Sequence, residues 1–424
     1  MNSFHLINAL DSMANEIEIK IEAGCLVESF GGDYKPTVID AKGLTVIPGL
    51  VDLHTHLREP GREDAETVLT GALAAVAGGY TAISAMPNTL PVADTAGVVE
   101  QVYRLGKAHK LCDVFPIGAV TIGQSGQQLA ELSAMNLSEA KVRIFSDDGH
   151  CVADPLVMRR ALEYVKLFDG VIAQHAQDPR LTENSQMNEG EISSILGLKG
   201  WPAVAEEAII ARDILLTEHV GSRLHICHVT TKGGVELIRA AKAKGVKVTA
   251  EVTPHHLILT DELARSYDSV YKVNPPLRTH TDVMALREGL ADGTIDIIAT
   301  DHAPHPQEAK DCEWGAAAFG MIGLETALSV AYMTMVETGL ISFSQLIEKM
   351  SVNPAQIGRY QDHGSLKIGQ KANLALVDLS AKWIVDTRGL RSKSKNTPFA
   401  GMELPVVVEK SFHNGALVFE RGVN

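Results

Sequence analysis

The sequence lacks the apolar runs of about 18 or more residues that membrane-spanning helices need. It is also poor in positive charge, with 38 Lys and Arg against 52 Asp and Glu and a formal net charge of −14. So acidic a chain repels the phosphate backbone, and we expect neither a nucleic-acid partner nor a membrane partner. The N-terminal segment has no basic start and no apolar core, so we predict no secretory signal.

Cysteine is scarce, and the cysteines present are scattered without a CxxC pair. They are Cys25, Cys112, Cys151, Cys227 and Cys312. This distribution argues against a disulfide framework and predicts reduced thiols in a cytoplasmic protein. Phosphate-binding glycine motifs are missing too, because neither GxGxxG nor GxxxxGK[ST] occurs. A doubly wound nucleotide-binding sheet would require such a loop after an early strand.

Short apolar, β-branched runs alternate with amphipathic stretches through the middle of the chain. The eight runs are 45–56, 80–87, 114–120, 141–148, 170–176, 223–229, 247–257 and 295–303. The stretches between them, such as AETVLTGALAAVAGG and AVAEEAIIARDILLTEHV, have helical periodicity. A strand followed by a helix, repeated eight times, predicts an α/β fold of the (β/α)8 TIM-barrel type.

The two ends of the chain have a different pattern. Short strands are predicted at EIEIKIEAG and PTVIDAKG before the barrel, and at ANLALVDL and the Asn414-Gly415 hairpin after it. We predict one small β-sandwich domain made of residues 1–47 and 364–424, beside a barrel of residues 48–363. Two unrelated β extensions are the alternative. The first 20 residues show no clear starting strand.

Polar residues follow most of the predicted barrel strands, where TIM-barrel active sites lie. These residues are His54, His56, Asn88, Asp148, His175, His228, His255, His256 and Asp301. Because the carboxyl ends of barrel strands meet at one mouth, the sequence predicts that these groups converge there.

A histidine pair ends the first barrel strand. His54 and His56 are two residues apart, so a strand places both imidazoles on one face, together with Asp52. Two imidazoles on one face can bind a divalent metal. The pair alone is weak evidence, since many such pairs are structural.

Three further candidate ligands end later strands. Asp148 in FSDDG can bridge two cations, but it also suits a turn or a helix cap, as does Asp147. A lone buried His is more often structural than a ligand. His175 and His228 on successive strands favour ligation, whereas His225 is three residues from His228 and falls on the other face.

Asp301 ends the eighth strand in TDHAPH, ahead of His302 and His305. A carboxylate beside a metal-bound water can take its proton and pass it to a leaving group. Four His and two Asp on five strands can hold a pair of divalent metals such as Zn²⁺. Two metals about 3.5–4 Å apart can share one hydroxide and polarise a carbonyl. This chemistry hydrolyses amides, esters or phosphoesters, and the residues leave that choice open.

Arg58, two residues after His56, suggests a clamp on a carboxylate or phosphate, although a surface ion pair with Glu59 or Glu63 is an equal alternative. Asn88 and Asn274 lie beside prolines in rigid turns that can aim an amide, and such turns are also common without a function. Phe319 and Gly320 can offer backbone groups to a planar ligand, which periodicity alone does not show.

At HTHLREPG, MPNT, FSDDG, ATDHAPHPQEAK and FGMIGLET the sequence resembles the bacterial class I dihydroorotases of the amidohydrolase superfamily. The segment 187–207 is similar too, and the resemblance covers residues 37–424. It implies a barrel with a small β-sandwich domain that holds both termini. It also implies zinc-dependent, reversible cyclisation of N-carbamoyl-L-aspartate to (S)-dihydroorotate, the third step of pyrimidine synthesis.

The same resemblance implies roles for individual residues. His54 and His56 match ligands of one zinc, His175 and His228 match ligands of a second, and Asp148 matches a bridging aspartate. Asp301 matches a ligand that also serves as general acid and base. The groups that match the substrate's contacts are Arg58, Asn88, Asn274, His305, Phe319 and Gly320. One or two zinc ions are implied, and two are expected.

Two alternatives remain open. Hydantoinases and allantoinases usually carry a bridging lysine on the fourth strand, which FSDDG lacks. Some dihydroorotase-like chains are non-catalytic partners of aspartate transcarbamoylase, but the ligand positions are intact here. Metal content would separate the two roles. We expect a homodimer or a complex with that transcarbamoylase, and either segment 149–154, with His150 and Cys151, or segment 306–318 as a lid.

Overall fold

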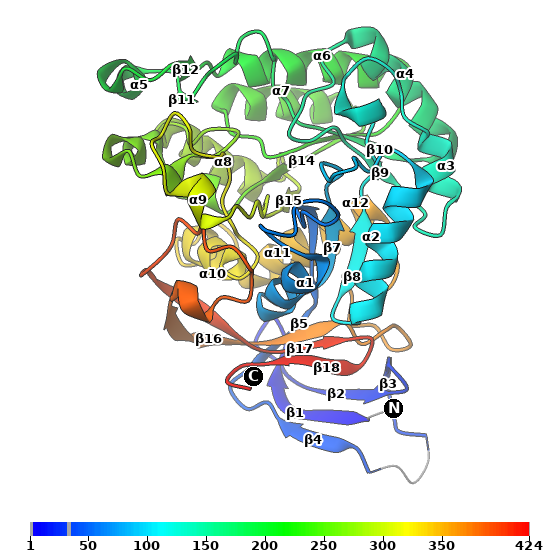
Figure 1. The fold of residues 1–424 in the computed structure, drawn as a ribbon. Coiled ribbons are helices and arrows are strands. Elements are labelled where there is room, and N and C mark those ends of the chain that lie inside the picture. Colours follow the sequence, from blue (N-terminus) through cyan, green and yellow to red (C-terminus); the bar gives the residue numbers. More distant parts are fainter. Residues whose placement is uncertain (1–2, 32–34, 424) are drawn as a thin grey trace.

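Parallel strands and helices alternate through the middle of the chain in the computed structural model, which describes residues 3–31 and 35–423 (Figure 1). The barrel strands are β6 (Leu50–Thr55), β7 (Tyr80–Ala85), β8 (Asp113–Pro116), β9 (Ile144–Phe145), β10 (Val171–Gln174), β13 (Leu224–Ile226), β14 (Val248–Val252) and β15 (Ile297–Ile298). Each of the eight predicted runs therefore contains a barrel strand. These strands are almost wholly buried, because helices cover the outer face of a parallel barrel.

The strands form a closed parallel ring. Strands β6, β7 and β8 pair in one group, and β9, β10, β13, β14 and β15 pair in another. Single bridges between Gly118 and Phe145, and between Thr55 and His302, join the two groups. The predicted (β/α)8 barrel is confirmed, and its strand ends meet at one mouth.

Helices and a short arm surround the barrel. The helices are α1 (Val68–Ala77), α2 (Ala96–His109), α3 (Leu132–Leu137), α4 (Pro155–Val165), α5 (Glu191–Leu196), α6 (Val204–Val220), α7 (Lys232–Ala243), α8 (His280–Asp292), α9 (Gln307–Lys310), α10 (Ala327–Ala331), α11 (Phe343–Ile347) and α12 (Asn353–Gly358). Side-chain caps fix several starts, such as Asp154, which accepts the N–H groups of Leu156 and Val157 at the start of α4. Strands β11 (Met187–Asn188) and β12 (Gly200–Trp201) pair in the arm.

Strands from both ends of the chain form one separate sheet. They are β1 (Phe4–Leu10), β2 (Glu16–Glu22), β3 (Cys25–Val27), β4 (Thr37–Asp40), β5 (Thr45–Pro48), β16 (Leu374–Ile384), β17 (Glu403–His413) and β18 (Ala416–Glu420). The order is β18-β17-β16-β5-β1-β2-β3, with β4 also paired to β1. The predicted small β domain built from both termini is therefore present. Residues 1–2, 32–34 and 424 of that domain lie outside the described residues, and its exact limits stay a prediction.

The start of the chain differs from the expectation of an unclear first strand. β1 is a regular partner of β2, but the pairing shifts between Leu6 and Ala9, and Asn8 has a φ of 59°. This bulge interrupts the two-residue alternation by which a strand is recognised in a sequence.

The predicted run 45–56 is two strands. β5 pairs with β16 in the small sheet, and β6 belongs to the barrel. Gly49 lies between them, where a Cβ would collide with the Thr81 side chain. The glycine therefore allows the chain to pass from one sheet to the other at close range.

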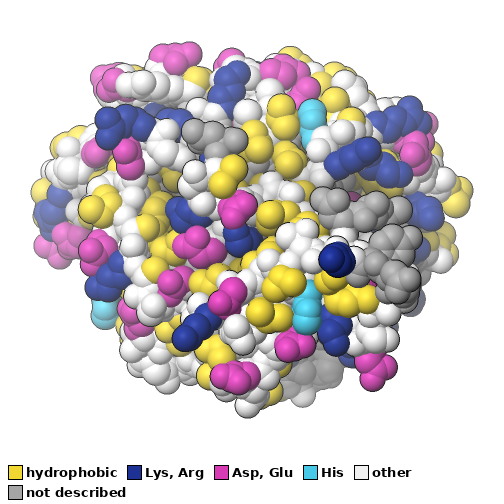
Figure 2. All heavy atoms as spheres, turned by 90° about the horizontal axis from the view of Figure 1, so that it is seen from below, with side chains coloured by type: hydrophobic (Ala, Val, Ile, Leu, Met, Phe, Trp, Pro, Cys, Tyr) yellow, Lys and Arg dark blue, Asp and Glu magenta, His cyan; other side chains and the backbone are white. Residues whose placement is uncertain are grey.

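Two surface features follow from this arrangement. Figure 2 views the molecule from the small-sheet end, where acidic and basic side chains are intermingled and apolar ones lie between them. Within the described residues, the helices are all too short or too polar to cross a membrane.

Candidate metal centre

One carboxylate, Asp148, lies between two pairs of imidazoles at the barrel mouth. Its Oδ2 atom is 3.3 Å from Nε2 of His54 and 3.3 Å from Nε2 of His56, both at the end of β6. Its Oδ1 atom is 3.1 Å from Nδ1 of His175, after β10, and 3.2 Å from Nε2 of His228, after β13. Four predicted ligands at the ends of three strands therefore converge on a fifth, Asp148, at the end of a fourth strand.

A sixth predicted ligand lies on the Oδ2 side. Oδ1 of Asp301 is 3.0 Å from Nε2 of His56 and 3.4 Å from Nε2 of His54. Both carboxylates and all four rings are buried.

The donor set fits divalent metal ions. Nε2 of His54 is buried without a hydrogen-bond partner among the described residues, and Nδ1 of His175 faces Nε2 of His228 at 2.8 Å. Nitrogens that face each other in this way need a cation or a proton between them. Tetrahedral coordination with bonds of about 2.0–2.1 Å separates the donor atoms by about 3.3 Å, close to the distances around Asp148. Imidazole with carboxylate suits a borderline ion.

Three site residues have left-handed backbone conformations. The φ angles are 62° for Arg58, 31° for His228 and 45° for Asp301, and each residue follows the end of a barrel strand. Such conformations cost free energy in residues other than glycine and cluster at functional sites. They aim the side chains into the mouth where an extended backbone would not.

The charges of the cluster depend on one another. Burial alone raises the pKa of Asp301, but the imidazoles of His54 and His56 outweigh it and lower that pKa to about 2. Burial is likewise outweighed at Asp148, where His54, His175 and His228 hold the pKa well below its usual value. Both carboxylates are therefore anionic, as metal ligands must be.

A buried glutamate that the sequence reading missed orients His54. Oε1 of Glu251, on β14, is 2.5 Å from Nδ1 of His54, and Oε2 is 3.0 Å from Nε2 of His225. The contact places the proton of His54 on Nδ1 and leaves Nε2 for a metal. The only available signal was a glutamate inside the apolar strand KVTAEV, where an unpaired charge would be costly.

A cavity of about 220 Å³ opens above the centre. Its lining residues are His56, Arg58, Asn88, Asp148, Gly149, His175, Asn274, Asp301, Ala303, His305, Phe319 and Gly320. The structure thus brings the predicted ligands and the predicted substrate-binding residues to one cavity, with His54 and His228 behind Asp148.

One wall of the cavity is cationic. Burial lowers the pKa of Arg58 only to about 10, so its guanidinium stays charged at neutral pH. Nε of Arg58 donates to the Pro304 carbonyl at 3.1 Å. Burial and the nearby Arg58 lower the pKa of His305 to about 3, so His305 is neutral and its Nε2–H donates to the Phe319 carbonyl at 2.8 Å.

Two asparagine side chains at the cavity offer opposite hydrogen-bonding groups to a ligand, one a donor and the other an acceptor. Oδ1 of Asn88 accepts from Nδ1 of His56 at 2.8 Å, which leaves the amino group of Asn88 as a donor for a ligand. Nδ2 of Asn274 donates to Oε1 of Gln177 at 3.3 Å, and its buried Oδ1 lacks a partner among the described residues. Gln177, which the sequence reading also missed, accepts from Nε2 of His175 at 2.7 Å as well.

Other candidates serve the scaffold. His302 turns away toward Glu66 at 3.3 Å, and Asp52 accepts the Thr300 N–H. Asp147 accepts the Val120 N–H at 2.8 Å, and Nε2 of His256 donates to the Pro275 carbonyl at 3.1 Å. These polar residues join neighbouring strand ends and fix the shape of the mouth.

Comparison with known proteins identifies the family. A family model described as dihydro-orotase-like matches residues 43–234. A dihydroorotase of Streptomyces coelicolor is 61% identical over 97% of each chain, and one of Mycobacterium tuberculosis is 53% identical over 91% of this chain and 90% of that one. The chain belongs to the dihydroorotase family. The resemblance seen in the sequence motifs is confirmed.

Solved structures of related enzymes have the same architecture. An L-hydantoinase (dihydropyrimidinase) from Arthrobacter aurescens superposes with a TM-score of 0.88 and 27% identity, covering 100% of this chain and 97% of that one. A D-hydantoinase superposes with a TM-score of 0.82 at 21% identity, which shows the fold alone. The dihydroorotase relatives and the L-hydantoinase together identify this member of the family as a cyclic amidohydrolase enzyme.

Proposed function

We propose that the chain converts N-carbamoyl-L-aspartate reversibly to (S)-dihydroorotate with loss of water, the third step of pyrimidine synthesis. One observation carries the proposal: a carboxylate flanked by four imidazoles shares a single cavity with a partly buried arginine. Cyclic amide chemistry needs the first group of residues, and a substrate that bears a carboxylate needs the second.

We propose two zinc ions at this centre. His54, His56, Asp148 and Asp301 would hold one, and His175, His228 and Asp148 would hold the other. When bound, such ions lower the pKa of a water molecule and polarise the amide carbonyl. The support is the set of nitrogen and oxygen atoms that converge there, and the lack of a hydrogen-bond partner for Nε2 of His54 among the described residues.

The chain's own groups would hold and orient the substrate. Arg58 supplies a half-buried positive charge for the carboxylate, and the amino group of Asn88 donates to an acceptor beside it. The free Oδ1 of Asn274 accepts from a ring N–H. His305 and the Phe319-Gly320 backbone form the remaining wall. Opposite polarity of the two amides favours a cyclic ureide bound in one orientation.

Asp301 is the proposed proton carrier. Its carboxylate lines the cavity beside His56. In the ring-opening direction it takes the proton of the attacking water and returns it to the departing ring nitrogen. In the synthetic direction the same oxygen removes a proton from the carbamoyl nitrogen and delivers it to the water that leaves.

The decisive test is ring opening of dihydroorotate by the purified full chain, with zinc added and then with a chelator. We expect zinc-dependent turnover and about two metal ions per chain by mass spectrometry. Intact metal content without turnover of dihydroorotate would contradict the proposed substrate. Preferred hydrolysis of hydantoin would point to a different cyclic amide instead.

We also propose that the enzyme works as a homodimer in the cytoplasm, where its five free cysteines stay reduced. Aspartate transcarbamoylase is the second partner to test. Light scattering of the purified chain should give twice its mass of 45.6 kDa. A monomer that turns over dihydroorotate at full rate would contradict the dimer.

A further inference from the structure

A segment that belongs by sequence to the small domain reaches the barrel mouth. The residues between β16 and β17, 385–402, leave the small sheet as a loop that we call the strap; it is the orange-red loop near α9 in Figure 1. Its base is closed by hydrogen bonds from Val385 N to the Met402 carbonyl and from Gly401 N to the Val385 carbonyl, both 2.9 Å. Much of its tip is buried.

Two barrel glutamates hold the middle of the strap. The Ser392 hydroxyl and the Lys393 N–H donate to Glu66, at 2.5 Å and 3.0 Å. The Arg391 N–H donates to Glu325 at 2.8 Å. Because Glu66 follows β6 and Glu325 precedes α10, the strap joins two separate loops of the mouth.

The next part of the strap reaches the substrate cavity through Asn396. Oδ1 of this amide accepts the N–H of His305 at 3.2 Å. Its Nδ2 donates to the carbonyls of Ala303 at 3.0 Å and Gly320 at 3.2 Å. Ala303, His305 and Gly320 all line the cavity. One side chain, 7% exposed, therefore ties together the two segments that form one wall.

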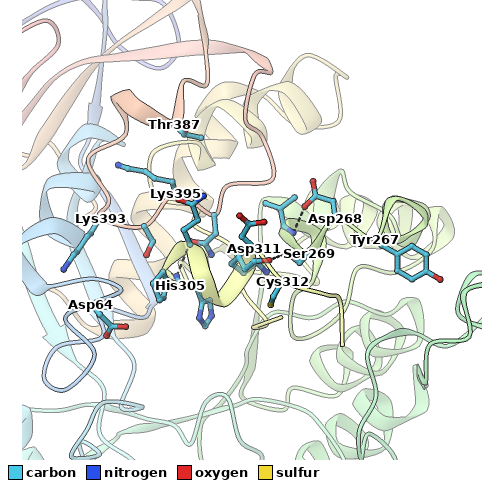
Figure 3. Close-up of a pocket in the computed structure, with 16 residues that line it drawn as sticks. Asp64, Tyr267, Asp268, Ser269, His305, Asp311, Cys312, Thr387, Lys393 and Lys395 are labelled. Atoms are coloured by element: carbon cyan, nitrogen blue, oxygen red, sulfur yellow. Dashed lines mark hydrogen bonds between the residues drawn. The ribbon is translucent and has the colours of Figure 1, made fainter. Parts of the chain in front are cut away.

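Packing gives this wall little support from the other side. A second cavity, of about 680 Å³, lies outside the loop that carries His305, and the strap borders it through Lys393 and Lys395 (Figure 3). A void cannot resist the displacement of a loop, because it offers no atoms to pack against. The hydrogen bonds of Asn396 therefore add to the direct backbone bond between the two segments, from Ala303 N to the Met321 carbonyl at 2.8 Å, in holding the wall in place.

The wall also has little tolerance for displacement. Gly320 has a φ of 144°, and a Cβ added there would lie 2.8 Å from Nε2 of His305. The same nitrogen is 2.8 Å from the Phe319 carbonyl. A shift of about 0.5 Å or more between the two segments would stretch this contact beyond the usual range of a hydrogen bond.

We infer that Asn396 is a positioning residue for substrate recognition, acting through His305 and the Phe319-Gly320 backbone. The inference rests on the proposed function, since it assigns the wall to the substrate. Binding groups must be held to within about 0.5 Å to act on a ligand. Loss of the amide should therefore weaken substrate binding more than it slows the chemical step.

The test compares two strap variants of the full, zinc-loaded chain. Asn396→Ala removes all three hydrogen bonds of the side chain, whereas Ser394→Ala removes a single buried one, from the Ser394 hydroxyl to the Ala65 carbonyl. For Asn396→Ala we expect KM for dihydroorotate to rise roughly tenfold and kcat to change less than about threefold. For Ser394→Ala we expect a lower Tm and an unchanged KM.

Two further readouts make the result decisive. Zinc content of Asn396→Ala should stay at the level of the unsubstituted chain, and dihydroorotate should raise its Tm less than it raises that of the unsubstituted chain. If Asn396→Ala does not fold, the isosteric Asn396→Asp replaces it, because Asp keeps the acceptor for His305 N and loses both donors. A KM within twofold of the unsubstituted value in the folded variant would overturn the inference. Lack of turnover by the unsubstituted chain would instead contradict the proposed function.

Discussion

At the scale of single residues, Asp148 has the most demanding position in the molecule. Its two oxygens face four imidazoles in a fully buried site, so a neutral or displaced side chain would leave the rings facing one another. Glu251 and Gln177 hold His54 and His175 from behind, each through the ring nitrogen that does not face Asp148. The tautomers of both rings are thereby fixed before any metal binds.

The proton-carrying role of Asp301 can be tested by one substitution. Asp301→Asn keeps the shape of the side chain but removes its basic oxygen and part of the metal site. We expect kcat for ring opening to fall by roughly 10²–10⁴-fold, with the circular dichroism spectrum unchanged. Near-normal turnover would exclude Asp301 as the base.

The role of Arg58 has a natural control nearby. Arg58→Met removes the cation of the cavity, and we expect KM for dihydroorotate to rise roughly 10- to 100-fold, the equivalent of about 1.5–3 kcal/mol for a charged hydrogen bond. Arg62→Met removes an exposed arginine of the same loop that pairs with Asp64. That control should leave KM unchanged, and an unchanged KM in Arg58→Met would remove Arg58 from the carboxylate clamp.

The proposed metal ligands could be picked out in the sequence because each one ends an apolar run. The residues that hold the site in place could not be predicted in this way. Glu251 and Asn396 act through residues 197 and 91 positions away, and Gln177 joins the nearby His175 to Asn274, which is 97 positions away. Apart from the charge of Glu251 inside an apolar strand, the sequence gives no sign of these contacts. The left-handed conformations of His228 and Asp301 are also invisible in a sequence, because they depend on the surrounding fold.

At the scale of elements, the ends of the barrel strands provide most of the residues of the site, and the strap bonds to one wall of its cavity. Parallel strands place their carboxyl ends together, so eight correctly predicted runs sufficed to predict a common mouth. The strap lies in a segment whose short strands predict only a small β domain. Its path across the mouth follows from hydrogen bonds to Glu66 and Glu325, which form only in the folded chain.

The anchor at Glu325 predicts a pH dependence of stability. Burial raises the pKa of this carboxyl to about 7, despite hydrogen bonds from Arg391 N and Ser392 N and the charge of Lys395, which lower it; Glu66 raises it further. The folded state thus binds more protons than the unfolded state between about pH 4.5 and pH 7. Stability from this group is fully present below that window and is lost as the pH rises through it.

Glu325→Gln should therefore become more stable relative to the unsubstituted chain as the pH rises from 5 to 8, because the amide oxygen can still accept both N–H groups. We expect the difference in Tm to grow by several degrees across that range. Glu337→Gln, at an exposed position, is the control and should show no such trend. A pH-independent difference for Glu325→Gln would contradict the raised pKa.

At the scale of the whole molecule, the small sheet and the barrel share part of one apolar core. Phe4, Leu6 and Phe412 pack within the small domain, whereas Val377 on β16 and Val408 on β17 belong to the same apolar cluster as the barrel strands and helices. Contacts between the two parts are also polar: Asp113 on β8 is 3.3 Å from Nε2 of His413 on β17. The small domain is thus joined to the barrel by apolar packing, by this polar contact and by the strap.

Metal removal should affect the whole fold as well as the activity. Without cations, the barrel mouth buries two carboxylates and four imidazoles against one another. We expect a chelator to abolish turnover and to lower Tm, and added zinc to restore both, because an ion that binds only the folded state stabilises it. An unchanged Tm after measured loss of metal would show that the cluster is stable on its own.

The strap has a consequence for the exchange of parts between relatives of this fold. Barrel enzymes are commonly altered by grafting the loops that follow their strands, as if each loop were independent. Here the loop after β15 shares its hydrogen bonds with a segment some 90 residues further along the chain, within the other domain. A graft of residues 303–320 alone would separate Asn396 from its partners, so a working chimera has to carry residues 385–402 with it.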